Sequence, residues 1–150
     1  MPPLLRLTFS LDADGTGELC AQASINGFAG RGAAWFSVQA LRDFARQLIA
    51  TYPLTDEPPL TLKGGHWDNH GPQTRIDQLH LGLAFYAIGT LGDIGCRVSL
   101  AAPPADNGRG ESAPSMQAEI RTTYVQVEKF ARALDQLALG LVDEALLESG

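Results

Sequence analysis

The residues best suited to chemistry lie in one short stretch near the middle of the chain. All three histidines, His66, His70 and His80, fall within fifteen residues, and Asp68 lies between the first two. Imidazole nitrogens and carboxylate oxygens are common zinc ligands, so this group could supply three or four ligands to one ion. The spacing matches no established zinc motif, because there is no H-E-x-x-H and no cysteine pair. A metal-binding protein or metal-dependent enzyme is therefore an alternative, and our main expectation is a protein without metal or cofactor.

No other local pattern predicts catalysis. The sequence contains no G-x-S-x-G, P-loop or kinase motif. Gly27, Gly30 and Gly32 precede a predicted strand, whereas a phosphate-binding loop precedes a helix, so we interpret them as a turn or bulge. Asp14-Gly15 predicts a hairpin turn rather than a calcium loop, since strands and not helices flank it. We therefore assign no catalytic residue and expect a protein that is not an enzyme.

The totals limit the class of protein and its partners. A chain of 150 residues is of the size of one domain and needs no metal or disulfide for stability. With 11 basic and 17 acidic residues the net charge is −6, which repels nucleic acid and anionic membranes. The sequence has neither a basic segment followed by a long apolar run at its start nor 18 consecutive apolar residues. We expect a cytoplasmic protein in which Cys20 and Cys96, on opposite faces of a sheet, form no disulfide.

The first part of the chain predicts three strands and a helix. Alternating apolar and polar residues indicate strands over residues 5–11, 18–25 and 32–36. Ser37 is a good N-cap, and apolar residues follow it at helical spacing until Tyr52-Pro53 ends the helix.

The second part predicts a similar order. A short strand over residues 60–63 is followed by a loop from Gly64 to Arg75, which has no periodicity and many turn-forming residues. Strands are predicted over 77–88, 94–102 and 115–122, with a mobile loop over 103–114. Thr123 caps the last helix, and residues 141–148 are expected to add a further turn or two of helix.

The element order βββα-β-βββα predicts an α+β fold. We expect a single, largely antiparallel sheet of about six to seven strands, with two amphipathic helices packed on one face. The helices share F-A-R-x-L, beginning at Phe44 and at Phe130. This shared pattern suggests one domain made of two degenerate βββα halves, about residues 4–52 and 77–140.

The outward face of that sheet is our candidate partner-binding surface. Strand parity directs polar side chains outward, and the types enriched at protein interfaces are tyrosine, tryptophan and arginine. Glu119 shares the face with arginines that would keep it ionised, which argues against acid–base catalysis. An ordinary solvated face is the alternative. The predicted binding residues are Trp67, Asp68, Tyr86, Arg97, Glu119 and Arg121.

Several short patterns resemble a known group of bacterial proteins. They are N-G-F-x-G from Asn26, Trp35-Phe36 before a helix with L-x-x-F-A-x-x-L from Leu41, and a strand ending at Gly64-Gly65. This arrangement is similar to small bacterial α+β proteins, some of them identified as WapI-like immunity proteins of polymorphic toxin systems. The resemblance implies a cytoplasmic protein that binds and blocks one toxin domain. The acidic charge suits a basic toxin, and the remaining alternative is a structural homodimer subunit.

Overall fold

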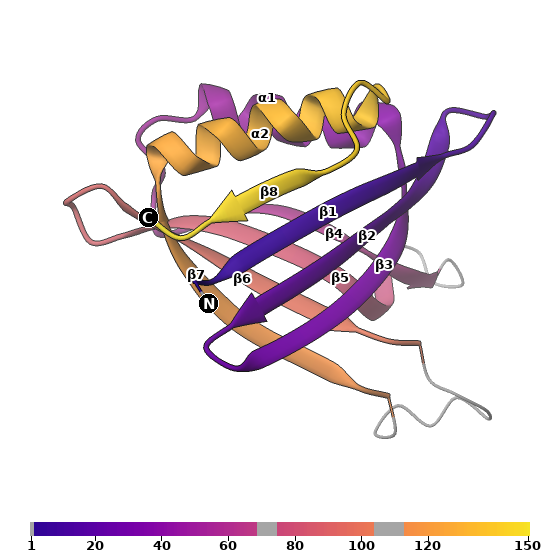
Figure 1. Cartoon of the computed structure of the whole chain (residues 1–150), viewed down its shortest axis with the longest axis horizontal. Helices are drawn as coiled ribbons and strands as arrows, with labels where there is room; N and C mark the ends of the chain where they lie inside the picture. The colour runs from indigo at the N-terminus through magenta and orange to yellow at the C-terminus, as the bar shows by residue number, and fades with distance from the viewer. Residues whose placement is uncertain (1, 69–74, 104–112) are drawn as a thin grey trace.

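The computed structural model describes residues 2–68, 75–103 and 113–150 and forms two sheets and two helices. Three strands in the first part of the chain are followed by one helix and one further strand, and the second part repeats this order (Figure 1). In chain order the elements are β1 (Leu4–Leu11), β2 (Thr16–Ile25), β3 (Phe28–Ser37), α1 (Val38–Ala50), β4 (Leu60–Asp68), β5 (Arg75–Ile88), β6 (Asp93–Ala101), β7 (Ser115–Thr123), α2 (Tyr124–Ala138) and β8 (Ala145–Glu148).

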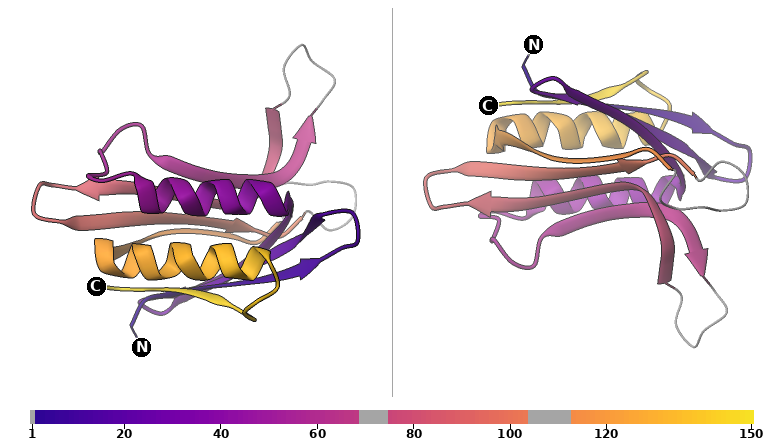
Figure 2. Two further views of the ribbon diagram at one scale, coloured as in Figure 1. Left: turned by 90° about the horizontal axis from the view of Figure 1, so that it is seen from above. Right: turned by 90° about the horizontal axis from the view of Figure 1, so that it is seen from below.

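The strands form two separate antiparallel sheets of four strands each. Sheet A has the order β3-β2-β1-β8, and sheet B has the order β4-β5-β6-β7. The predicted α+β class and the antiparallel pairing are confirmed. The prediction of a single sheet is wrong, because β3 crosses sheet B instead of pairing with it. The two helices lie side by side along one side of the two sheets (Figures 1 and 2).

Two glycines explain why β3 crosses sheet B so closely. A Cβ atom added at Gly32 would collide with the backbone oxygen of His80 on β5, and one added at Gly30 would collide with the side chain of Met116 on β7. Without side chains at these two positions, the β3 backbone lies directly against the other sheet. A period-two pattern cannot distinguish such a crossing from pairing, since both bury alternate residues.

Several segments differ from their predicted structure. The predicted turn or bulge at Gly30 and Gly32 is wrong, because β3 already begins at Phe28 and both glycines pair with β2. The predicted loop from Gly64 to Arg75 is wrong at both ends, because β4 continues to Asp68 and β5 already begins at Arg75. Register shifts between Gly64 and Gly65 and between His66 and Trp67 interrupt the alternation that would have revealed the strand. Residues 69–74, and residues 104–112 of the predicted 103–114 loop, lie outside the described residues.

The predicted extra helix over 141–148 is also wrong. The chain turns at Gly140, whose φ is +75°, and then forms β8. Ala145 and Leu147 are buried against the core, and Leu5 pairs with Leu147 in the register of β1. A four-residue strand is too short for its alternation to be separated from a helical pattern.

The two sheets have the same construction. In the first half, three sequential strands lead through α1 to β4, which pairs with β5 of the other half. In the second half, three sequential strands lead through α2 to β8, which pairs with β1. Each half therefore donates its last strand to the sheet of the other half, and a common origin of the halves stays a prediction.

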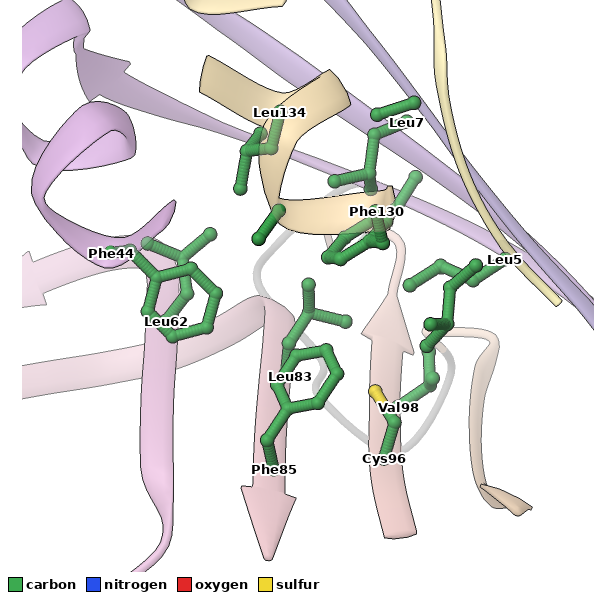
Figure 3. Close-up of a cluster of buried hydrophobic side chains, with 14 of the residues drawn as sticks. Leu5, Leu7, Phe44, Leu62, Leu83, Phe85, Cys96, Val98, Phe130 and Leu134 are labelled. Atoms are coloured by element: carbon green, nitrogen blue, oxygen red, sulfur yellow. The ribbon is translucent and has the colours of Figure 1, made fainter. Parts of the chain in front are cut away.

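The core lies between the two sheets and beneath the two helices. The ring centroid of Phe85 on β5 is 6.0 Å from that of Phe44 on α1 and 5.9 Å from that of Phe130 on α2. Leu5 and Leu7 of sheet A are fully buried on the same cluster (Figure 3). Since Phe44 and Phe130 are the phenylalanines of the shared F-A-R-x-L pattern, that pattern marks core positions.

The helices begin where their caps predict. Ser37 Oγ accepts a hydrogen bond from the Ala40 amide at 3.0 Å, and Thr123 Oγ1 accepts one from the Gln126 amide at 3.4 Å. Cys20 is half-buried in sheet A and Cys96 is buried in sheet B, and both are free thiols. Among the helices of the described ranges, none is long and apolar enough to cross a membrane.

Candidate protein-binding surface

Three of the predicted binding residues meet on the outer face of sheet B. Arg97 on β6 pairs with Glu119 on β7, and Tyr86 projects from β5 two residue pairs further along. The Tyr86 hydroxyl donates a hydrogen bond to Glu119 Oε2. Arg97 Nη2 donates to Tyr86 Oη at 3.5 Å and lies 3.8 Å from Glu119 Oε2. We call these three residues the Tyr86 cluster.

A glycine on the neighbouring strand supports the aromatic ring of this cluster. Gly95 is the register partner of Tyr86 on β6. A Cβ atom added at Gly95 would lie 2.8 Å from Tyr86 Cζ, so the ring lies flat over the glycine. The missing side chain thus lets the Tyr86 hydroxyl reach across β6 to Glu119 on β7.

The fourth predicted residue extends this surface along β7. Arg121 pairs with Gly95 in the register, and its Nη2 lies 3.3 Å from Asp93 Oδ2. The side chains of Arg121 and Asp93 are 63% and 53% exposed. Neither helix covers this face, because both lie on the other side of sheet B (Figure 1). Together, the Tyr86 cluster and the Arg121–Asp93 pair form one exposed polar surface over β5, β6 and β7.

The electrostatics of the Tyr86 cluster favour binding over proton transfer. Partial burial raises the pKa of Tyr86 to about 12, with a further increase from the hydrogen bond to Glu119, while Arg97 opposes the shift. The phenol therefore stays protonated and donates its hydrogen at neutral pH. A phenol with such a high pKa is a poor general base, because an effective one has a pKa near the working pH.

Trp67 and Asp68 do not join this surface. They lie at the end of β4, where their register partners are Ile76 and Arg75 at the start of β5. Tyr86 lies ten residues further along β5 than Ile76, a path of roughly 30 Å in an extended strand. The β4–β5 hairpin also bends away from the body at this end (Figure 2). The structure thus divides the six predicted binding residues between two places.

The described residues provide no cluster of ligands for the metal hypothesis. Within ranges 2–68, 75–103 and 113–150, no group of three or more histidine, cysteine or acidic side chains gathers as a metal site would require. His80 Nε2 lies 3.2 Å from Gln78 Oε1, and His66 is the register partner of Gln78. His70 lies outside the described residues. The histidines that the structure describes thus lie near an amide side chain.

Sequence reasoning missed a cleft beside β3. Its walls contain charged and aromatic side chains from sheet A, namely Glu18, Arg31 and Trp35, and it also includes His80 of sheet B. Trp35 is 57% exposed although it precedes the buried Phe36. Strand parity from Phe36 would have placed Trp35 outward, which is the one signal in the sequence for this site.

Comparisons of the chain with protein-family models, with curated proteins and with solved structures find no match. The assignment of a function therefore depends on the geometry of these surfaces.

Proposed function

We propose that this protein is a non-enzymatic protein-binding module that neutralises a cognate bacterial toxin domain in the cytoplasm. The Tyr86 cluster is the observation that carries the proposal. It places a tyrosine, an arginine and a carboxylate in mutual contact on an exposed sheet face. Tyrosine and arginine are the residue types that contribute most at protein interfaces.

The contacts within the cluster favour recognition of a protein. Because Glu119 holds the Tyr86 hydroxyl and lies beside the Arg97 guanidinium, the three side chains keep one arrangement before a partner arrives. Binding then orders fewer side chains, which lowers its entropic cost. The surface spans three strands, so its breadth suits a protein better than a small molecule.

The net charge supports a basic partner. At −6 the protein attracts a positively charged domain over distances of about a Debye length, and opposite potentials accelerate association. The resemblance to WapI-like immunity proteins points to a toxin domain as that partner. Neutralisation would follow if the bound protein covers the toxin's active surface.

Co-purification with the toxin domain encoded beside this gene tests the proposal. We expect a one-to-one complex with a dissociation constant of about 10 nM or tighter, measured by isothermal titration calorimetry. Arg97→Glu should weaken this complex about a hundredfold, since it removes an interface anchor and repels Glu119.

Arg6→Glu is the matched control for Arg97→Glu. Arg6 also forms an ion pair on an outer sheet face, and its side chain is 48% exposed against 47% for Arg97, but it belongs to sheet A. We expect Arg6→Glu to leave the affinity unchanged. Equal losses in both variants would exclude the outer face of sheet B, and no complex with any neighbouring gene product would refute the toxin proposal.

A further inference from the structure

The cleft missed by the sequence runs along the outer edge of β3. Five consecutive β3 residues, Arg31 to Trp35, line it. Gly65, His80 and the segment from Ala101 to Pro103 form the opposite wall. Within the described residues, β3 is an edge strand of sheet A that pairs with β2. An edge strand presents a row of backbone N–H and C=O groups along its open side.

We infer that this edge binds an extended peptide segment of a partner protein, which adds to sheet A as a further antiparallel strand. The added backbone would satisfy the open hydrogen-bonding groups of β3. Small side chains line the cleft on both sides, at Ala33 and Ala34 of β3 and at Ala101 and Ala102 opposite. Antiparallel addition follows the pairing of the strands that the structure describes.

The other half of the molecule shows a backbone contact at the equivalent edge. Arg121 lies two residues before the cap Thr123, as Trp35 lies two residues before the cap Ser37. The Arg121 carbonyl accepts a hydrogen bond from the Gly150 amide at 3.2 Å. The edge of β7 therefore accepts one backbone hydrogen bond from another segment of this chain at the position that corresponds to Trp35.

Flanking side chains predict the sequence of the peptide. Arg31, Ala33 and Trp35 share one face of β3, and Glu18 is the register partner of Trp35 on β2. A lysine opposite Trp35 would contact the indole and extend toward the Glu18 carboxylate. An acidic residue four positions later would face Arg31, with an apolar residue between them opposite Ala33. In an antiparallel strand this order reads K-x-Φ-x-E, where Φ is apolar.

This site lies on a different sheet from the Tyr86 cluster, so its test needs no toxin. The probes are two fluorescein-labelled nine-residue peptides of β-branched residues, one with K-x-Φ-x-E in the centre and one with E-x-Φ-x-K. Fluorescence anisotropy measures their binding to the full chain. We expect the lysine-first peptide to bind about fivefold more tightly, because two exposed charge pairs favour it. Equal affinities, or no binding of either peptide, would overturn the inference.

Backbone methylation separates strand addition from simple charge attraction. In one derivative of the lysine-first peptide every second amide nitrogen is methylated, and in another the intervening nitrogens are methylated. Only one set of amides faces β3, so we expect one derivative to lose at least about tenfold in affinity and the other to bind as before. Similar affinities for the two derivatives would exclude strand addition.

Charge inversion in the protein locates the peptide. The double variant Glu18→Lys and Arg31→Glu should prefer the glutamate-first peptide. As a matched control, Asp43→Lys with Arg46→Glu inverts an exposed ion pair on α1 and should leave the preference unchanged. Circular dichroism establishes that both variants fold. A preference that does not reverse in the first variant, or that reverses in the control, would remove the site from β3.

Discussion

The hydroxyl of Tyr86 reports on the arrangement of the outer face of sheet B. Partial burial and Glu119 raise its pKa to about 12, whereas Arg97 lowers it. We expect Glu119→Gln to lower the pKa of Tyr86, because the anionic acceptor is removed. Replacing Tyr52 and Tyr124 by phenylalanine leaves Tyr86 as the tyrosine that titrates in an ultraviolet absorbance experiment. A pKa that does not change in Glu119→Gln would show that the hydroxyl and carboxylate are apart in solution.

The same shift predicts how stability depends on pH. The folded-state pKa of about 12 lies above the ordinary tyrosine pKa of 10.0, so between these values the folded state holds the proton more firmly. Its contribution is complete below about pH 10 and is lost as the pH rises through the folded-state value. We expect urea unfolding to show a smaller decrease in stability between pH 9 and pH 11 in Tyr86→Phe than in the parent. An equal decrease would contradict the shift.

The two cysteines should differ in reactivity. Cys96 is fully buried, and burial raises the pKa of its thiol well above the usual range, which suppresses the reactive thiolate. Cys20 is half-buried on the outer face of β2. We expect iodoacetamide to modify Cys20 in the native protein and Cys96 only after unfolding, as mapped by peptide mass spectrometry. Modification of Cys96 at the same rate in the native protein would contradict its place in the core.

At the scale of the elements, the crossing of β3 over sheet B depends on the absence of a side chain at Gly32. We expect Gly32→Ala to destabilise the protein by at least about 2 kcal/mol, since the new methyl group would collide with the rigid backbone of His80. Chemical denaturation measures the free energy of unfolding.

Gly82→Ala is the control for this substitution. Its added Cβ atom would lie 3.1 Å from the flexible end of Leu79 and in ordinary contact with Ser99 Cβ at 3.6 Å. We expect its stability to remain within about 1 kcal/mol of the parent. If Gly32→Ala were as stable as Gly82→Ala, β3 would not lie against the β5 backbone.

Most elements were predictable from the sequence, whereas their assembly into two sheets was not. Ser37 and Thr123 predict where the helices begin, because each cap bonds an amide only three residues later in the sequence. The pairing of β8 with β1 joins residues about 140 positions apart, and no local pattern encodes such a contact. Of the candidate binding surface, parity placed Tyr86, Arg97 and Glu119 together. It could not exclude Trp67, since the bulges in β4 are invisible to a period-two pattern.

At the scale of the whole molecule, each half donates its last strand to the sheet of the other half. The pair of β4 and β5 is therefore equivalent to the pair of β8 and β1. The Ser149 amide lies 3.4 Å from the Pro3 carbonyl, so the two ends of the described chain are adjacent. A circular permutant that joins Gly150 to Pro2 by a short linker and begins at Arg75 would keep both sheets. We expect it to fold with the parent's circular dichroism spectrum and most of its thermal stability.

The control for the permutant is the chain cut before Arg75 without the new linker, so that it consists of two separate fragments. Because β4 and β8 would then join the fragments without a covalent connection, we expect their stability to depend on concentration. A permutant that remains unfolded would contradict the equivalence of the two connections.

The exchange of strands also has a consequence for protein synthesis. At about 5–20 residues per second, a ribosome would add β8 roughly 7 to 28 s after β1. During that interval the edge of β1 that β8 covers in the native fold stays open. The interval between the synthesis of β4 and that of its partner β5 is shorter. Open strand edges pair readily with other chains. The nascent chain is therefore most vulnerable to aggregation before β8 emerges, and a translational pause within α2 would prolong that exposure.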